Sequence, residues 1–378
     1  MSRWIEHRAL IIGVKENTAA WQAAVEGAFF SARIETLYKK FKVLSAGAFG
    51  VVMSAERVPD NTKVAVKMIK GGSVAEANAL LEVRILIYLQ QVEGAGGCRA
   101  DITCYHKHFR ARIGDALQTE IAKRDANVTT NGEYFFIETR FEPGNTLKHM
   151  MKEEHLDGHQ RSFAWNVEMM WSLSNAARFL HEHGVYHRDF KPENIIINNA
   201  GASQLPQGVI LDVGVACVET QCGTALAGST HYLPPNAAPL LKPGANYVIE
   251  PTARAKFDVY ALAATFYEWM TQTEMSGPTA DRPIPPYLEP GQKPTTTLYR
   301  VKEDDKIWEI IAKALITVIQ KPATATGPME EFAYAFRALR PSIAPPTKLP
   351  PPPASATMPP KPVARPTTKK ALPSVPQK

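Results

Sequence analysis

The chain has 378 residues, of which 45% are hydrophobic and 21% charged, so it can bury one large core or two smaller ones. The net charge of +6 comes from residues 341–378, which hold six basic residues and no acidic one; the rest keeps 37 of the 43 basic side chains against 37 acidic ones. This balance argues against a folded body that binds nucleic acid, and no apolar run reaches the roughly 18 residues of a membrane helix. Four cysteines argue against a disulfide framework. We therefore expect an intracellular, cytoplasmic protein and leave a nuclear location open.

Residues 1–37 form a predicted amino-terminal extension. Thr18 is a candidate helix N-cap, and after it apolar residues recur at helical spacing: Trp21, Val25, Ala28, Phe29 and Ala32. We expect an amphipathic helix that packs on the domain behind it, and binding of this helix to a partner is the alternative.

Residues 42–52 are predicted to form a strand, a glycine-bearing turn and a second strand. Gly47 and Gly50 in the turn would let the backbone approach phosphate groups closely. Residues 64–67 follow as an apolar strand that ends in Lys67. This combination resembles the glycine-rich loop and the lysine-bearing strand of protein kinases, although Ser45 stands where that family has its first glycine.

The resemblance implies roles for several residues around a nucleotide. Lys67 would hold the α- and β-phosphates of ATP, while Val52 and Ala65 would cover the adenine. Ser45, Gly47 and Gly50 would lie over the phosphates, with Ser45 weakening nucleotide affinity at most. These assignments predict an ATP site in the first third of the chain.

Residues 75–86 are rich in helix formers and predict a helix. Glu82 matches the register of the C-helix glutamate of protein kinases, which implies that Glu82 pairs with Lys67. Glu76 is a competing candidate whose register fits less well. Residues 110–132 resemble a long connection that leads to a strand at 134–137.

Residues 138–147 resemble the hinge between the two kinase lobes. Alignment on Gly144 and Leu147 makes Thr139 the residue at the back of the nucleotide pocket, with a one-residue shift left open. Backbone groups of residues 140–142, Phe141 among them, would then face the adenine edge. A helix is predicted from Trp165 to His183.

Residues 184–197 read GVYHRDFKPENIII. Pro192 forbids a continuous helix, and the three isoleucines indicate a short buried strand, so a loop packed on the core is expected. Asp189, Lys191 and Asn194 place a base, a cation and an amide within six residues, which suits phosphoryl transfer. The alternative is an ordinary polar surface loop.

This run resembles the catalytic loop of eukaryotic-type protein kinases, with Phe190 where leucine is commoner. The resemblance implies that Asp189 is the catalytic base, that Lys191 offsets phosphate charge and that Asn194 binds Mg²⁺. Lys191, two residues after the base, is typical of the serine/threonine branch. Ile196, in the strand that follows, is expected in the nucleotide pocket.

Residues 208–214 predict a buried strand that ends in Asp212 and Gly214. The stretch resembles the DFG motif with Val213 in place of phenylalanine, which implies that Asp212 is the second metal ligand. Because valine is smaller, we expect a looser hydrophobic column through His187 to Leu86, and Val213→Phe is expected to raise activity.

The activation segment is expected from Asp212 to about Pro235. It contains four hydroxyl side chains, any of which Arg188 could receive in phosphorylated form: Thr220, Thr224, Ser229 and Thr230. Cys217 and Cys222 also lie here, and we expect free thiols in preference to a redox switch.

Residues 257–270 resemble the central helix of the large kinase lobe, which implies that Asp258 holds the backbone of the catalytic loop. Helices are also predicted at 308–319 and 329–339. Residues 271–305 are proline-rich and loop-like. Asn236 replaces the glutamate of the family's A-P-E motif, and residues 321–326 lack its usual arginine partner, so both members of one ion pair are missing together.

Residues 341–378 contain 13 prolines and no aromatic residue, which predicts a disordered, basic tail. The tail is either a ligand for proline-recognising modules or a spacer.

The resemblance covers residues 38–340 and implies a bilobal α+β fold. A small antiparallel β-sheet lobe is expected at about 38–139 and a larger, mainly α-helical lobe at about 144–340. The implied function is a serine/threonine protein kinase that uses ATP and Mg²⁺ on protein hydroxyls, with no nucleic-acid or membrane partner. The main alternative is a pseudokinase that acts as an ATP-binding scaffold. Glu193 hints at basic residues near the acceptor hydroxyl.

Overall fold

The computed structural model describes a set of ranges within the chain: 30–31, 33–47, 50–70, 73–93, 97–124, 132–154, 156, 158–198, 205–220, 222, 227–235, 237, 251–272, 304–320 and 328–340. The chain divides into two units, Met1–Pro341 and Ser342–Lys378. The second unit, with the predicted proline-rich tail, lies outside the described residues. So do the predicted helix up to residue 29, most of the loop-like stretch 271–305, Asn236 and residues 321–326.

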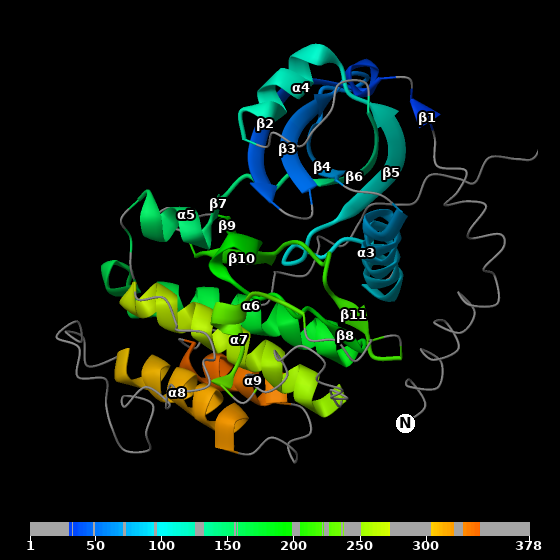
Figure 1. The fold of residues 1–378 in the computed structure, drawn as a ribbon. Helices are drawn as coiled ribbons and strands as arrows, with labels where there is room; N and C mark the ends of the chain where they lie inside the picture. The colour runs from blue at the N-terminus through cyan, green and yellow to red at the C-terminus, as the bar shows by residue number, and fades with distance from the viewer. Residues whose placement is uncertain are drawn as a thin grey trace, which may run out of the picture. The chain divides into compact units, whose positions relative to one another are not determined.

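A six-stranded sheet forms the amino-terminal lobe, with its strands in the order β1-β5-β6-β4-β3-β2 (Figure 1). The strands are β1 Phe30–Ser31, β2 Tyr38–Gly47, β3 Gly50–Arg57, β4 Lys63–Ile69, β5 Tyr105–Arg112 and β6 Glu133–Arg140. The short β1 is parallel to β5, and all other neighbours are antiparallel. The predicted antiparallel sheet lobe is confirmed.

The two faces of this sheet carry different sets of side chains, because successive side chains along a strand point to opposite faces. Val52 pairs with Lys67 and Ala65 pairs with Thr139, so these four side chains share one face. The opposite face carries fully buried apolar residues of the same strands, among them Val51, Met53, Val64, Val66 and Met68.

A helix that the sequence analysis missed covers this second face. α4, Asp115–Ala122, lies against the sheet (Figure 1), within the stretch expected to be a long connection. Its Leu117 and Ile121 are buried in the same apolar cluster. Just before the sheet, the 3₁₀ helix η1, Ile34–Thr36, adds a fully buried Ile34. The predicted amphipathic helix is wrong at its end, since Phe30 and Ser31 form strand β1.

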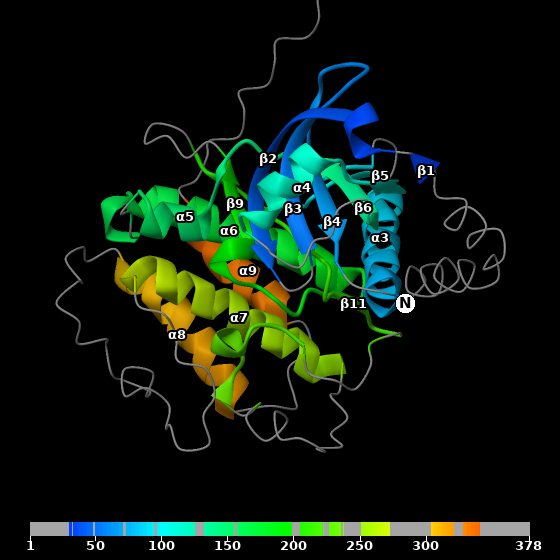
Figure 2. The same cartoon turned by 45° about the horizontal axis from the view of Figure 1, so that its top comes forward.

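α3, Ser73–Glu93, runs beside the sheet and connects the two cores (Figure 2). Val83 and Ala79 pack with the sheet residues Phe135 and Ile137, while Leu86 belongs to the large core of the helical lobe. Its position therefore couples the sheet lobe to the helical lobe.

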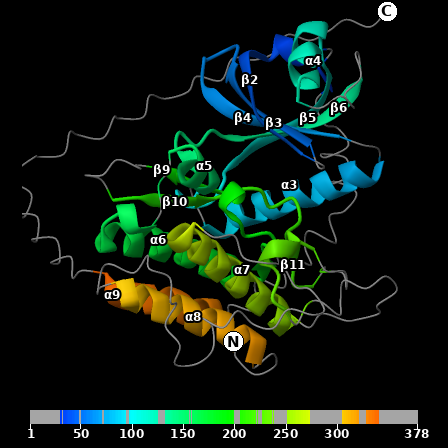
Figure 3. The ribbon, with the colours of Figure 1, turned by 60° about the vertical axis from the view of Figure 1, so that its left-hand side comes forward.

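The second lobe is built mainly from helices (Figure 3): α5 Leu147–Lys152, α6 Phe163–Glu182, α7 Pro251–Thr271, α8 Asp304–Gln320 and α9 Pro328–Leu339. α6 packs on α9, and α7 packs on α8. The Trp269 ring of α7 is fully buried and donates its indole N–H to Asn166 Oδ1 of α6 at 2.9 Å. No helix in the described ranges is long and apolar enough to cross a membrane.

Short strands and 3₁₀ turns lie where this lobe faces the sheet. β7 Asn145–Thr146, β9 Ile195–Asn198 and β10 Gln207–Ile210 form a three-stranded sheet, and β8 Val185–Tyr186 pairs with β11 Cys217–Val218. The 3₁₀ helices are η2 Gly158–Gln160, η3 Pro192–Asn194 and η4 Thr230–Tyr232. β8, η3 and β9 hold the predicted catalytic loop between them.

The cysteines differ from expectation. Disulfide bonds join Cys98 to Cys104 and Cys217 to Cys222. Their Cα atoms are 5.4 and 5.1 Å apart, which is within the usual range for a disulfide. The expectation of free thiols in the activation segment is therefore wrong for this structure.

Candidate active site

A cavity of about 210 Å³ lies between the sheet and the helical lobe. Of the predicted nucleotide and metal residues, ten line it: Ser45, Val52, Ala65, Lys67, Glu82, Thr139, Phe141, Asn194, Ile196 and Asp212. Gly47 and Gly50 do not line it. Gly50 has a different structural need, because a side chain there would collide with the backbone carbonyl of Met68 on the neighbouring strand.

Arg140 and Glu142 of the predicted hinge also line the cavity, as do Leu86 and Glu193, which the sequence analysis named for other roles. Five further residues of the lining were not named there: Leu44, Thr103, Ile137, Thr146 and Leu211. Ile137 could have been found from strand alternation, since it lies two residues before Thr139 and so shares its face. Thr103 could not, because it comes from the connection after α3 and reaches the cavity only through the tertiary fold.

Lys67 lies at the centre of a charged cluster in this cavity. Its Nζ is 2.9 Å from Glu82 Oε2 and 2.7 Å from Asp212 Oδ1. Burial alone lowers the pKa of Lys67, but the two carboxylates outweigh it and raise that pKa above its usual range. Burial raises the pKa of Glu82, because it disfavours the ionised form of a carboxyl group. Burial also opposes ionisation of Asp212, but Lys67 holds the pKa of that carboxyl below its ordinary value. The ammonium thus stays charged between α3 and the end of β10.

Two residues of the site have left-handed backbone conformations that cost energy for a side-chain-bearing residue. Asp212 has φ 45° and Arg188 has φ 65°. Such conformations persist only where the surroundings impose them, and they gather at functional sites.

Asp258 of α7 supplies that constraint for the catalytic loop. Its carboxylate accepts hydrogen bonds from the backbone N–H groups of His187 and Arg188, both at 2.7 Å. The predicted anchoring of the loop by Asp258 is confirmed. A third contact joins Asp258 Oδ2 to His181 Nε2 of α6 at 2.9 Å. The Asp258 carboxylate of α7 thus contacts both the catalytic loop and α6.

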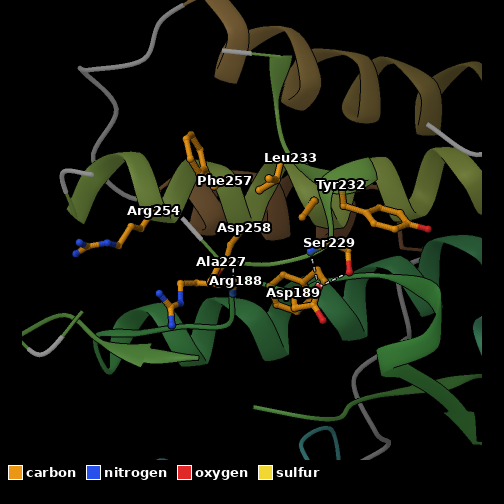
Figure 4. Close-up of a pocket in the computed structure, with 11 residues that line it drawn as sticks. Arg188, Asp189, Ala227, Ser229, Tyr232, Leu233, Arg254, Phe257 and Asp258 are labelled. Atoms are coloured by element: carbon orange, nitrogen blue, oxygen red, sulfur yellow. Dashed lines mark hydrogen bonds between the residues drawn. The ribbon is translucent and has the colours of Figure 1, made fainter. Parts of the chain in front are cut away.

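Asp189 has three hydrogen-bonding neighbours, Lys191, Asn194 and Ser229, of which Figure 4 shows Ser229. Its Oδ2 is 2.7 Å from Lys191 Nζ and accepts from Asn194 Nδ2 at 3.0 Å. Its Oδ1 accepts from the Ser229 hydroxyl at 2.8 Å and from the Ser229 N–H at 2.9 Å. Lys191 Nζ also donates to Ser229 Oγ at 2.8 Å. A hydroxyl oxygen therefore lies between the carboxylate and the ammonium.

The backbone at Gly228 makes this arrangement possible. Gly228 has φ +110°, and any side chain there would collide with the backbone carbonyl of Arg188. Only glycine allows the segment to pass this close to the catalytic loop and present Ser229. Sequence analysis identified Ser229 only as one hydroxyl among four, since nothing in the linear order shows that it meets Asp189.

The hydrophobic column differs from the one expected at Val213. The ring of Phe190 stacks on His187 with centroids 4.3 Å apart and an interplanar angle of 15°. Phe190 is fully buried in the same core cluster as Leu86 and Val213. The large side chain thus stands at 190 and the small one at 213. Phe190 thus contributes to the core that contains Val213 a ring that stacks on His187.

Arg188 is already engaged by the activation segment. Its Nε donates to the backbone carbonyl of Val215 at 2.6 Å. Burial lowers the pKa of Arg188, which the positive charge of Arg254 on α7 lowers further. Two guanidinium groups therefore come near each other beside the segment that holds Thr220.

Comparisons with known proteins agree with this fold. The protein kinase domain family matches residues 38–321, and the chain belongs to that family. It is similar to the serine/threonine-protein kinase dkf-1 of Caenorhabditis elegans, with 31% identity over 51% of this chain and 23% of that protein. It is 27% identical to the serine/threonine-protein kinase PknB of Mycolicibacterium smegmatis over 47% of this chain and 24% of PknB.

A further relative is the Schizosaccharomyces pombe protein named "Negative regulator of sexual conjugation and meiosis", with 27% identity over 51% of this chain and 35% of that protein. In all three cases the chain matches about a third or less of the relative's length. The shared part is thus a kinase domain.

Proposed function

We propose that the chain is a serine/threonine protein kinase that transfers the γ-phosphate of ATP to hydroxyl groups of proteins. The observation that carries the proposal is the Ser229 hydroxyl, held 2.8 Å from Asp189 Oδ1 and 2.8 Å from Lys191 Nζ. A substrate hydroxyl in that place would meet a base for its proton and a cation for the transferring phosphate.

The proposed catalytic residues are Asp189 as base and Lys191 as the cation beside the transferred group. Lys67, fixed by Glu82, would hold the nucleotide phosphates, and Thr139 would lie at the back of the adenine pocket. Orientation and charge supply most of the rate in phosphoryl transfer, so residues already held at hydrogen-bonding distance suit the reaction.

The residues at the rim of the cavity fit ATP with Mg²⁺. Asn194 donates Nδ2 to the backbone oxygen of Asp189 at 2.9 Å, which leaves its Oδ1 available as a metal ligand. Asp212 adds a carboxylate whose lowered pKa keeps it ionised. Carboxylate and amide oxygens are ligands that Mg²⁺ accepts. When bound, the ion would neutralise phosphate charge during transfer.

A transfer assay with labelled ATP tests the proposal on the purified full chain. The wild type is expected to label a mixed protein or peptide substrate, and Asp189→Ala is expected to lower the rate by at least about a hundredfold. Asp60→Ala is the matched control, because Asp60 lies in an exposed turn after β3; it should leave the rate unchanged.

The same assay separates the main alternative, a pseudokinase that binds ATP as a regulatory scaffold. Nucleotide binding with equal labelling by the wild type and Asp189→Ala would favour the scaffold. The intact set of charged residues at Lys67, Asp189 and Asp212 supports catalysis instead.

Two finer parts of the proposal concern the surroundings of the enzyme. An intracellular location suits the use of ATP, whereas the Cys98–Cys104 and Cys217–Cys222 bridges suit an oxidising compartment. Alkylation of the protein directly from cells, followed by mass spectrometry, shows which cysteines are free there.

We also propose residues 350–353 and 359–362 as ligands of a proline-recognising module. Binding of a tail peptide to SH3 or WW domains would test this proposal.

A further inference from the structure

A buried carboxylate on α7 is linked through Tyr232 to the segment that carries the proposed acceptor position. Glu268 is 2% exposed and accepts a hydrogen bond from the Tyr232 hydroxyl. Tyr232 belongs to η4 and follows Ser229, whose hydroxyl contacts Asp189, by three residues (Figure 4). Glu268 therefore connects through one side chain to the segment beside the catalytic base.

A second carboxylate approaches from the catalytic loop itself. Glu193 lies in η3, directly before Asn194, and its side chain is 47% exposed. Glu193 and Glu268 together present acidic charge beside the loop that carries Asp189. Acidic side chains next to an acceptor site attract basic residues of a substrate.

The chain supplies its own cation to this pair. Lys148 of α5 places Nζ 2.8 Å from Glu268 Oε1 and 3.9 Å from Glu193 Oε1. The Lys148 side chain is 32% exposed and that of Glu268 is 2% exposed, so Lys148 is the more accessible member of this pair. α5 packs directly against η3, which fixes the helix that carries Lys148 next to the catalytic loop.

We propose that Lys148 is a specificity-determining residue that occupies, from within the chain, the place where a basic side chain of a substrate would bind. An ion pair within one chain forms at high effective concentration, so a substrate lysine or arginine gains little by competing for it. The enzyme would then accept serine or threonine peptides without a basic residue at this subsite. The inference rests on the proposed kinase function and replaces the preference for basic residues that Glu193 alone suggested.

The test is a peptide library with a central serine, in which single positions on either side carry arginine or glutamine. For the wild type, the kcat/KM ratio of arginine to glutamine peptides should stay within about twofold at every position. Lys148→Met should raise that ratio about tenfold at one position, mainly through KM, because the two carboxylates then need a cation. A ratio unchanged by Lys148→Met, or a strong arginine preference in the wild type, would overturn the inference.

Three further variants separate specificity from structure. Lys148→Arg keeps the cation and should behave as the wild type. Lys152→Met removes an exposed lysine of the same helix and should change nothing. Lys148→Met/Glu193→Gln should lose most of the gained arginine preference.

The outcomes remain interpretable if the variant is damaged. A merely structural role for Lys148 would lower the melting temperature and slow transfer to all peptides equally; that result would overturn the inference. No transfer to any peptide by the wild type would overturn the proposed function itself, and the inference with it.

Discussion

Glu138 on β6 gives a quantitative test of how the amino-terminal lobe is held together. Its carboxylate is fully buried and accepts from Arg57 Nε at 2.9 Å and Nη2 at 2.7 Å. It also contacts His106 Nδ1 at 3.1 Å and accepts from the Tyr38 hydroxyl. Burial opposes the ionised form, but the hydrogen bonds from these partners outweigh it and lower the pKa of Glu138 to about 2.

Glu138→Gln removes the charge at nearly constant shape. One unit of pKa difference is worth about 1.36 kcal/mol, so a pKa of about 2 in place of 4.5 corresponds to about 3 kcal/mol at pH 7. Because the folded pKa is the lower one, this stabilisation is complete above the unfolded value of 4.5 and is lost as the pH falls through about 2.

Urea denaturation followed by tryptophan fluorescence measures this contribution. The free energy of unfolding of Glu138→Gln should lie about 3 kcal/mol below that of the wild type at pH 7, and the gap should shrink to roughly half by about pH 3. Glu133→Gln, on the same strand with a side chain 41% exposed, should differ by less than about 0.5 kcal/mol. A gap below about 1 kcal/mol at pH 7, or one that does not change with pH, would refute the reasoning.

Three further predictions concern the helical lobe. Asp258→Asn turns an amide N–H toward backbone donors and should lower the free energy of unfolding by about 3 kcal/mol in urea denaturation; unchanged stability would contradict its anchoring role. Gly228→Ala should displace Ser229 and slow phosphate transfer at least about tenfold at unchanged ATP affinity, and a wild-type rate would show that the close approach is dispensable. Phe190→Leu and Val213→Phe should each cost about 1–3 kcal/mol, while the double variant recovers most of the loss; additive costs in the double-mutant cycle would show that the positions do not share space.

The fold class was predictable through the resemblance to protein kinases, and local apolar patterns placed several of the helices and strands. The long helices α6 and α7 carry uninterrupted apolar periodicity, and their predicted bounds differ from the observed ones only at the ends. Pro192 and the isoleucines after it predicted a loop followed by a short strand, and the resemblance to the kinase motif marked that loop as catalytic. The roles of Lys67 and Asp212 were predicted through the resemblance to protein kinases. Asp189 was predicted also from its place beside Lys191 and Asn194, since a base, a cation and an amide within six residues suit phosphoryl transfer.

The rest depended on tertiary contacts. α4 has only eight residues, and the two apolar side chains that hold it, Leu117 and Ile121, become informative only against a sheet face. β1 has two residues and exists because β5 has a free edge. Cysteine pairing depends on Cα distances that spacing does not reveal.

The charged clusters away from the cavity could not be read from the sequence either. Lys148 and Glu268 are separated by 120 positions, and Tyr38 and Glu138 by 100. No local pattern marks such pairs, because each residue taken alone resembles an ordinary polar side chain on a strand or helix. Their roles emerge only when burial and partners are known.

The central claim is that Asp189 acts on a hydroxyl while Lys67 and Asp212 hold the nucleotide. Single-turnover transfer from labelled ATP, measured together with ATP affinity for the wild type and Asp189→Asn, tests it most directly. The account predicts nearly equal affinity, because Asp189 does not line the nucleotide cavity, and a transfer rate at least about a hundredfold lower for the variant. Equal transfer rates, or a wild type that binds ATP without transferring phosphate to any protein hydroxyl, would contradict it.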